Sequence, residues 1–352
     1  MLPLRVRGLV YGSNLQELVH RETPHTVVGL GCSYTGWGRT HSEKQVLRTL
    51  DVQIQLNQTL ARAESAFVSS FRATSLVEPI DWQPNQSSSD QIVYNGATSF
   101  RGLLPVLHGE TGPERYRVVN DLRNYSQREL AGILHLRSIR APLSAVYENK
   151  AAETREDSDG AEAPYLLNER SDVLDEVSAW YTKRLSLSGL SVEPGTAAFR
   201  LMSGPRSREH NIARAGQGLQ QVLPIVTYLA AMKLGVLKRR LVVIEEPELH
   251  LHPSAHGGLS DLVIETLRAR PALQMAIETH SENFILRIRR RVADGQLSPH
   301  DVNILWFDNS EGAGRNVREI LINHDGSVTD WPSGVFSEDL DEVRAIARAG
   351  RP

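Results

Sequence analysis

The stretch that most constrains the fold runs from Leu241 to Pro253, where an apolar run passes directly into two carboxylates and a proline. A short apolar run bounded by a proline is typical of a buried strand in a parallel sheet. Acids at the carboxyl end of such a strand lie where open α/β sheets bind ligands. Glu245 and Glu246 are therefore suited to hold magnesium on a nucleotide or to position an attacking water. The alternative is an ordinary strand followed by a charged turn.

Composition limits the class of protein. The chain has 352 residues, 40% of them apolar, which is enough for one large domain or two of ordinary size. A net charge of -3 gives no global basic field that would announce nucleic acid. Cys32 is the only cysteine, so no disulfide can form within the chain, which fits a reducing cytosol.

Membrane and targeting signals are also missing from the sequence. The longest apolar run, from Val222 to Val236, is too short for a membrane span and contains Lys233. The first residues, Met1 to Arg5, have no signal-peptide pattern. We therefore expect a cytoplasmic protein with no membrane partner.

A change in composition predicts the domain organisation. Residues 149–163 are charged, small and free of aromatics, which is typical of a flexible linker. We therefore predict an N-terminal lobe over residues 1–148 and a C-terminal lobe over residues 164–352. Alternating apolar residues between Gln45 and Thr74 predict an antiparallel meander in the first lobe. Near its end, helical spacing at 130–134 is followed by a predicted strand at 136–142.

The last third of the chain alternates strands and helices. An apolar helix is expected from Val222 to Leu237, and another from Asp261 to Arg268. The segment Leu273–His280 is a predicted strand, and Ser281 is the predicted cap of the helix that follows it. Further strands are predicted at 302–307 and 317–322. This alternation indicates an α/β fold with a parallel, doubly wound sheet.

Three features of this region fit one kind of chemistry. Glycines at Gly216 and Gly218 open a helix, whose free N–H groups and positive dipole end suit an anion such as a terminal phosphate. The carboxylate pair follows, and supplies magnesium binding and water positioning. His280 comes after one further helix and strand, and can contact the same phosphate or hold the water.

These motifs resemble those of a known family. The residues from Ile244 to Pro253 are similar to the Walker B strand and following loop of ABC-type P-loop ATPase heads of the RecF-like and SMC-like kind. More closely, they are similar to those of the bacterial AAA-family ATPases related to the overcoming-lysogenisation-defect nucleases. The residues from Ala215 to Pro224 resemble the signature segment of that group, and those from Glu278 to Glu282 resemble its switch-histidine segment.

The resemblance implies a fold and a role for each candidate residue. The fold is a P-loop NTPase head of ABC type, with a mostly parallel sheet, an antiparallel N-terminal subdomain and a helical signature segment. Glu245 takes the place of the acid that holds Mg²⁺ through water, Glu246 that of the catalytic glutamate, and His280 that of the γ-phosphate sensor. The signature segment reaches ATP held by the opposite subunit, and its candidate residues are Gly216, Gln217, Gly218, Gln220 and Gln221.

The same resemblance implies cofactors and partners. ATP and Mg²⁺ are the implied cofactors. A second head, in a head-to-tail homodimer or heterodimer closed around ATP, is the implied partner. Nucleic acid or a nuclease is a further candidate partner.

The sequence departs from the family pattern in two places. No Gly-x-x-x-x-Gly-Lys-Ser/Thr loop occurs, and the nearest arrangement, Gly31 to Trp37, lacks the lysine, so we interpret it as an ordinary turn. Relatives carry that Walker A loop ahead of the segment resembling Gly12–His20. The simplest account is that this chain begins after the loop, through a mis-assigned start, a truncated gene or a split ATPase. The second departure, Gln220, stands where relatives often have serine, which puts direct signature contacts to phosphate in doubt.

Two functions follow as alternatives. The first is an ATPase that gates a bacterial defence or DNA-repair assembly, and the second is a catalytically inactive scaffold or regulatory subunit. Two side features have less specific interpretations. His250 and His252 with Glu248 suggest a metal site, but the family context favours an interface loop. The arginines between Arg287 and Arg291 are interpreted as a solvated helix face rather than a DNA contact.

Overall fold

In the computed structural model the chain forms two compact units, Met1–Leu130 and Ala131–Pro352. The structure describes residues 132–150, 158–185, 189–205, 207–308, 316–329 and 338–349, the single positions Asn120 and Trp331, and the backbone of strands β1 to β10. The segment resembling the family at Gly12–His20 lies outside the described residues.

The first unit contains antiparallel sheets. Their orders are β1-β2, β3-β4-β5-β6 and β10-β9-β8-β7. The strands are β1 (Arg5–Val6), β2 (Leu9–Val10), β3 (Val28–Arg39), β4 (Gln45–Gln58), β5 (Ala66–Ser75), β6 (Ile80–Trp82), β7 (Pro84–Asn85), β8 (Val93–Tyr94), β9 (Thr98–Arg101) and β10 (Leu104–Leu107). The predicted meander between Gln45 and Thr74 is confirmed, because β4 and β5 pair antiparallel.

The interpretation of Gly31–Trp37 as a turn is wrong. These residues lie inside the long strand β3, where Gly31 is opposite Gln53 and Trp37 is opposite Leu47 on β4. The glycines suggested a turn, but the backbone pairing with the 14-residue strand β4 keeps the segment extended.

The second unit is built around a parallel sheet. Strand β16 (Leu241–Glu245) pairs parallel with β11 (Ile133–Leu136) on one side and with β17 (Gln274–Glu278) on the other. The α/β fold class predicted from the sequence is therefore confirmed. Along β16 the side chains alternate, with Val242 and Ile244 fully buried and the others partly exposed. One face of this sheet thus joins the core, and both of its outer strands end beside Glu245.

Helices fill the space beside this sheet. The helices of this unit are α2 (Ala163–Glu169), α3 (Ser171–Leu185), α4 (Gln217–Lys233), α5 (Pro253–Ala269), α6 (Glu282–Ala293) and α7 (Glu338–Ala349), with 3-10 turns η2 (Ile212–Arg214) and η3 (Pro299–Asp301). Every residue of α4 from Gln221 to Met232 is buried. A helix that is apolar all round belongs in the centre of a domain, and α4 packs against α2, α3 and α5.

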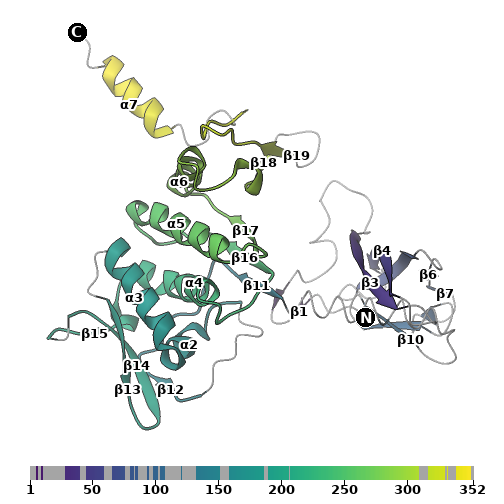
Figure 1. Ribbon diagram of the computed structural model, residues 1–352, viewed down its shortest axis with the longest axis horizontal. Helices are drawn as coiled ribbons and strands as arrows, with labels where there is room; N and C mark the ends of the chain where they lie inside the picture. Colours follow the sequence, from purple (N-terminus) through teal and green to yellow (C-terminus); the bar gives the residue numbers. More distant parts are fainter. Residues whose placement is uncertain are drawn as a thin grey trace. The chain divides into compact units, whose positions relative to one another are not determined.

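A second, antiparallel sheet lies on the far side of these helices. Its order is β12 (Tyr147–Glu148), β14 (Ala198–Ser203) and β13 (Leu190–Pro194), and β15 (His210–Asn211) pairs with β14. Figure 1 shows α2, α3 and α4 between this sheet and the parallel one. The unit therefore has a layer of helices between two sheets of different kinds.

The end of the chain departs from the predicted alternation. The predicted strands are present as β18 (Ile304–Asp308) and β19 (Asn316–Ile320), but they pair with each other antiparallel in a separate sheet. The connection between them is too short for a helical crossover, so only a hairpin can form. Among the helices of the described residues, none is both long and apolar enough to cross a membrane.

The chain also divides at a different place from the predicted linker. The predicted helix at 130–134 and strand at 136–142 are replaced by strand β11 and an extended loop, and β11 pairs with β16 of the predicted C-terminal lobe. The described part of the linker, residues 158–163, is packed against this unit. Arg137 N donates to Ser158 O at 3.0 Å, and a Cβ on Gly160 would meet Pro224 of α4 at 2.3 Å.

Candidate functional site

The two adjacent carboxylates at the end of β16 have different surroundings. Glu245 is engaged through both oxygens, since its Oε1 lies 2.7 Å from His135 Nε2 and its Oε2 accepts from Ser138 N at 3.0 Å. Glu246 has a left-handed backbone with φ 40°, and its N–H donates to Glu278 O at 2.8 Å. Among the described residues its half-buried carboxylate has no hydrogen-bond partner. Glu246 is therefore the acid of the pair that is free to react.

A buried arginine lies behind these carboxylates. Arg140 is 2% exposed, and its Nη2 donates to the backbone oxygens of Glu245 at 2.6 Å and of Glu246 at 3.1 Å. Burial lowers the pKa of Arg140 to about 10, although Glu248, Glu246 and Glu245 act in the opposite direction. The guanidinium therefore remains charged at neutral pH, and places a cation beneath the three acids.

His280 is placed by a third glutamate. The buried carboxylate of Glu248 accepts from His280 N at 2.7 Å and from Thr279 Oγ1 at 2.8 Å. Ser281 N donates to Thr279 Oγ1 at 3.1 Å, and Ser281 Oγ accepts from Phe284 N to cap α6, as the sequence predicted. The loop after β16 is thereby tied to the end of β17, and the exposed imidazole of His280 begins at the same edge of the sheet as Glu246.

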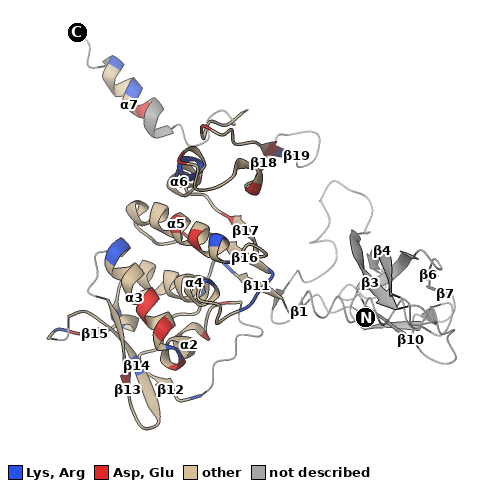
Figure 2. Ribbon diagram, in the orientation of Figure 1, with Lys and Arg blue, Asp and Glu red and all other residues tan. Residues whose placement is uncertain are grey.

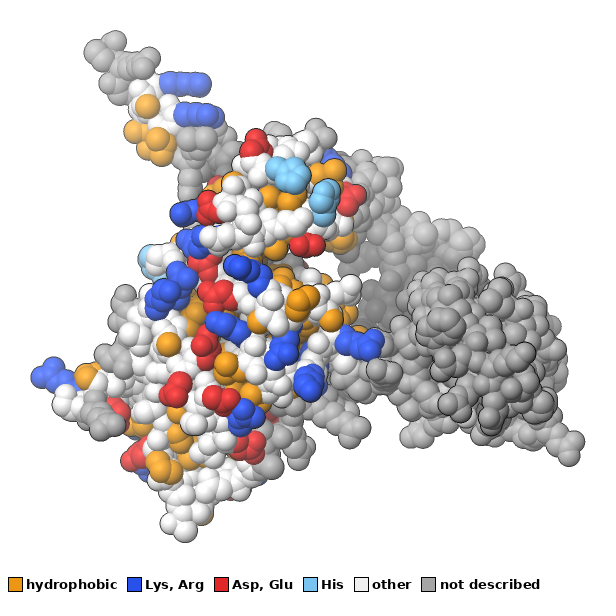
Figure 3. All heavy atoms as spheres, viewed as in Figure 1, with side chains coloured by type: hydrophobic (Ala, Val, Ile, Leu, Met, Phe, Trp, Pro, Cys, Tyr) orange, Lys and Arg blue, Asp and Glu red, His pale blue; other side chains and the backbone are white. Residues whose placement is uncertain are grey.

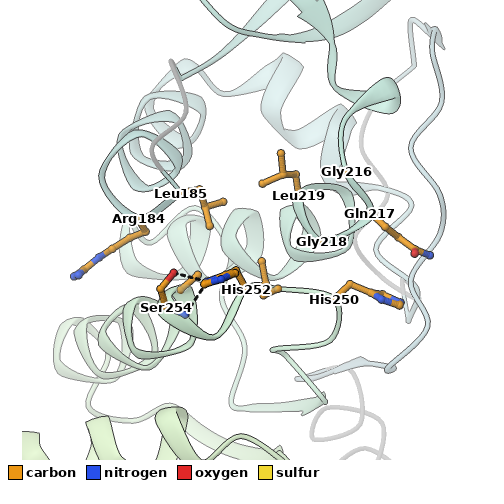
Figure 4. Close-up of a pocket in the computed structure, with 11 residues that line it drawn as sticks. Arg184, Leu185, Gly216, Gln217, Gly218, Leu219, His250, His252 and Ser254 are labelled. Carbon is orange, nitrogen blue, oxygen red and sulfur yellow. Dashed lines mark hydrogen bonds between the residues drawn. The ribbon is translucent and has the colours of Figure 1, made fainter.

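The glycine segment opens onto a pocket of about 530 Å³. Its walls come from the end of α3, the start of α4 and the loop that leads into α5, and Figure 4 shows Arg184 at one end of it and Gln217 and His250 at the other. Gly216 is the N-cap of α4, and a Cβ added there would meet nothing within 4 Å. The space beside Gly216 is therefore open at the start of α4, and the first N–H groups of a helix are a usual anion site.

The remaining candidates of the glycine segment divide into two groups. Gln217 is exposed and Gly218 is packed so closely on the loop that a Cβ would meet His250 O at 2.2 Å. Gln220 donates to Ala213 O at 3.2 Å and to Ala215 O at 2.8 Å, so its amide caps the preceding turn.

Gln221 has a different role from the one predicted for it. It is 7% exposed, its Oε1 accepts from Arg140 N at 3.1 Å, and its Nε2 donates to Arg140 O at 3.2 Å. The amide pairs with the Arg140 backbone inside the core, and Gln221 is not among the residues that line the pocket, so Gln221 is a structural partner of Arg140.

The histidines after Glu248 do not gather with that glutamate. His252 caps α5, accepting from Ser254 N, and Figure 4 shows this contact at the pocket wall. His250 is exposed and has φ 65°. Within the described residues, no group of three or more His, Cys, Asp or Glu side chains is arranged to hold a metal ion.

The interpretation of the α6 arginines as a solvated face is wrong for two of them. Arg287 and Arg291 form ion pairs with Asp261 of α5 at 2.5 and 2.8 Å, and Arg184 of α3 joins the same carboxylate at 3.0 Å. In the ribbon of Figure 2, acidic residues are coloured along α5 and basic residues along α6, and these two helices pack against each other. The helical pattern predicted an exposed stripe, but it could not show that α5 buries an acid opposite it.

Sequence reasoning did not place His135 or Arg140 beside Glu245 and Glu246, and it grouped Glu248 with His250 and His252 rather than with the His280 segment. Arg140 lies near Pro142 at the end of a predicted strand, and residue type alone favoured a surface position or a structural pairing over a place at the site. The partners of these residues lie more than 100 positions away for His135 and Arg140 and 32 for Glu248.

The region that carries the site is similar to a known domain family. Residues 128–285 match the AAA ATPase domain family, and this segment contains every residue of the site described above. The match supports an AAA-type, nucleotide-binding P-loop ATPase domain in this part of the chain. No curated protein matches the chain at a significant level.

Solved structures of SMC heads are also similar to this chain. The SMC head domain from Thermotoga maritima has 9% identity and a TM-score of 0.33, with 79% of this chain and 74% of that chain covered. An SMC head bound to the C-winged helix domain of ScpA has 10% identity and a TM-score of 0.35, with 80% and 77% covered. An Smc head with an extended coiled coil, bound to the C-terminal domain of ScpA and derived from Pyrococcus furiosus, has 11% identity and a TM-score of 0.32. That match covers 53% of this chain and spans 40% of the other, and likenesses at this level carry no inference about residues or partners.

Proposed function

We propose that this chain is an ATP-binding and ATP-hydrolysing component of ABC type, with Glu246 as the residue that polarises the attacking water. The observation that supports this most is the unequal partnering of the acid pair. Glu245 is engaged through both oxygens, whereas the Glu246 carboxylate has no hydrogen-bond partner among the described residues. A general base must have such a free oxygen to accept a proton from water.

The residues at this edge fit magnesium and ATP. Carboxylate oxygens are the ligands that Mg²⁺ prefers, and it usually keeps several waters. Because both oxygens of Glu245 are engaged, this residue is suited to hold the ion through water rather than directly. ATP with Mg²⁺, when bound, supplies the phosphoryl group that is transferred to water. His280, whose backbone Glu248 holds, is then the residue to contact the terminal phosphate.

The pocket at the glycine segment is proposed as the second half of such a site. The start of α4, with Gly216, Gln217 and Gly218, would contact the nucleotide held by another head in a head-to-tail dimer. The open N-terminus of α4 and the exposed His250 support this role. The engaged amides of Gln220 and Gln221 remove those two side chains from it.

We place this activity in a bacterial defence or DNA-repair assembly, where nucleotide binding gates a partner. The support is the resemblance of the motifs to ATPases related to defence nucleases. On the face drawn in Figure 3, basic and acidic side chains are interspersed rather than gathered into one basic patch. A nuclease or another head therefore suits this face better as a partner than nucleic acid does.

Hydrolysis by the purified chain tests the proposal. Binding of Mg²⁺-ATP is measured by titration calorimetry and turnover by phosphate release. We expect Glu246→Gln to keep ATP binding and to lower turnover by about 10²–10⁴-fold, the usual contribution of a general base. The matched control is Glu193→Gln, at an exposed position of β13. It should leave both ATP binding and turnover unchanged.

The outcomes separate the two candidate functions. Binding without turnover in the unaltered chain, alone and mixed with the products of its neighbouring genes, would support the scaffold or regulatory subunit instead. That alternative is supported by the engaged Glu245 and by the lack of a glycine-lysine loop in this sequence. No binding of ATP under any of these conditions would overturn the proposed function.

A further inference from the structure

We propose that Arg140 is a positioning residue that holds Glu246 in its reactive conformation and joins it to the helix that begins at the glycine segment. This inference rests on the proposed function, because it assigns a role in ATP turnover to a residue that acts through the backbone of Glu245 and Glu246. It explains how the Glu246 carboxylate is held in place without a hydrogen bond to it from the described residues.

The backbone of Glu246 is the first part of this connection. A φ of 40° is uncommon for a residue with a side chain and costs free energy unless its surroundings hold it. Arg140 Nη2 donates to the carbonyl oxygens of both Glu245 and Glu246, on either side of the strained peptide unit. The guanidinium therefore binds the backbone of the acid pair rather than its carboxylates, and within the described part of the chain no cation is bonded to the Glu246 carboxylate.

Gln221 is the second part. Its side-chain amide pairs with both the N–H and the C=O of Arg140, at 3.1 and 3.2 Å, and Arg140 Nη1 lies 3.5 Å from Gln221 O. Gln221 lies in the first turns of α4, whose N-cap is Gly216. A continuous set of hydrogen bonds thus runs from the helix that lines the pocket to the backbone of Glu246.

Stability alone is a weak reason for an arginine at this place. Replacing buried ionic groups with well-packed apolar residues is often neutral or stabilising. Arg140 also leaves its Nε buried without a hydrogen-bond partner among the described residues, which costs further free energy. What the guanidinium supplies and an apolar side chain cannot is a pair of donors directed at two successive carbonyls.

Three variants separate positioning from stability. Arg140→Met has a similar length and no donors. Arg140→Lys keeps the charge and enough donors for the carbonyls of Glu245 and Glu246, but not the reach to Gln221 O. Gln221→Leu removes the amide that holds the Arg140 backbone and leaves the guanidinium in place. Arg137→Met is the matched control, since it makes the same change in the same loop at a half-buried arginine with no bond to the acid pair.

We expect a fall in kcat with little change in KM, scaled to the amount of folded, ATP-binding protein. Arg140→Met should lower kcat by about a hundredfold, the effect of a small misplacement of a catalytic group. Arg140→Lys should keep at least a tenth of the kcat of the unaltered chain. The kcat of Gln221→Leu should lie between those of Arg140→Met and Arg140→Lys. A merely structural role would instead lower the folded fraction and leave kcat per binding site unchanged, which would overturn the inference.

Hydrogen exchange gives a second measurement that needs no turnover. Amides in the peptide from Glu246 to His252 should exchange faster in Arg140→Met and near the normal rate in Arg140→Lys and Arg137→Met. If the unaltered chain does not hydrolyse ATP, the proposed function fails, while the exchange result still tests whether Arg140 holds this loop. Equal exchange in Arg140→Met and the unaltered chain would show that it does not, and would overturn the inference even in an active ATPase.

Discussion

Two clusters of charge in the second unit have opposite compositions. At the edge of the parallel sheet one buried arginine, Arg140, is surrounded by three glutamates, and its guanidinium donates only to backbone oxygens. At the junction of α3, α5 and α6 one buried aspartate, Asp261, binds three arginines directly. In the first cluster the guanidinium of Arg140 does not bind the glutamate carboxylates. In the second cluster the arginines bind both carboxylate oxygens of Asp261.

The difference separates a site from a structural contact. The carboxylate oxygens of Asp261 accept from the guanidinium groups of Arg184, Arg287 and Arg291, so no lone acid remains there to react. Among the glutamates, Glu245 and Glu248 are engaged by neighbours, and Glu246 is free within the described part of the chain. Buried ions that are fully paired fix helices in place, while an ion held near its partner but not bonded to it stays available for chemistry.

The largest effect on stability is expected at Asp261. Asp261→Ala leaves three arginines facing each other at the junction of three helices, and removing one member of a buried ion pair costs about 3–5 kcal/mol. Because these arginines are 20–26% exposed, we expect a loss near the lower end, about 3 kcal/mol in the free energy of unfolding by urea. Asp172→Ala, at a fully exposed pair with Arg170, is the control and should leave the midpoint of unfolding unchanged. A loss at Asp261 no larger than that of the control would show that the cluster is not structural.

Acid provides a second way to break the aspartate cluster. Burial alone would raise the pKa of Asp261, but Arg291, Arg287 and Arg184 together lower it below its usual value. The stabilisation is therefore complete above the pKa of an unfolded aspartate, about 3.9, and is lost as the pH falls from there through the lower folded pKa.

The pH dependence is measured as a difference. The gap in the free energy of unfolding between the unaltered chain and Asp261→Asn should be constant above about pH 5 and should narrow below about pH 4. A gap that stays constant down to the acid limit of folding would contradict the lowered pKa.

A smaller loss in the free energy of unfolding is expected when Glu248 is replaced. Glu248→Ala removes the acceptor of both His280 N and Thr279 Oγ1, and leaving a buried donor unsatisfied costs about 1–3 kcal/mol. Glu248→Gln keeps one acceptor oxygen and should recover part of this loss. Urea unfolding of the two variants shows whether Glu248→Gln is the more stable, as expected. If Glu248→Gln is no more stable than Glu248→Ala, the hydrogen bonds to the His280 segment contribute little.

The smallest effect on the free energy of unfolding is expected at Glu246. Glu246→Gln should change the free energy of unfolding by less than about 0.5 kcal/mol, because its carboxylate holds nothing in place. This variant sharpens the comparison, since the same change that removes turnover should leave the melting temperature almost unaltered. A large destabilisation would show that Glu246 is a structural acid, as Asp261 is.

Much of the fold was predictable because it depends on local patterns. Apolar runs and periodicity predicted β16, β17, α4 and α5, and the serine before α6 predicted its cap. Predictions failed where pairing with distant segments decided the outcome. Residues 130–136 had an ambiguous apolar pattern, and parallel pairing with β16 made β11 a strand. The glycines of β3 suggested a turn, and pairing with β4 kept them extended.

The candidate residues of the site were predicted from their positions at strand ends and helix starts, and their roles stay predictions. Glu245, Glu246, the glycine segment and His280 were identified because strand ends and helix starts place such residues at one edge of an α/β sheet. The roles of their neighbours were not predictable. The pairing of Gln221 with Arg140 joins positions 81 residues apart, and nothing in either segment indicates the other.

The sequence by itself therefore determined which acids stand at the carboxyl end of β16 and which helix begins beside them. Only the tertiary structure decided which of those acids is free. That outcome depends on His135, Ser138 and Arg140, which reach Glu245 and Glu246 because parallel pairing places the end of β11 beside the end of β16. Periodicity along a chain determines which face a side chain occupies, but the partner that neutralises a charge is set by folding in three dimensions.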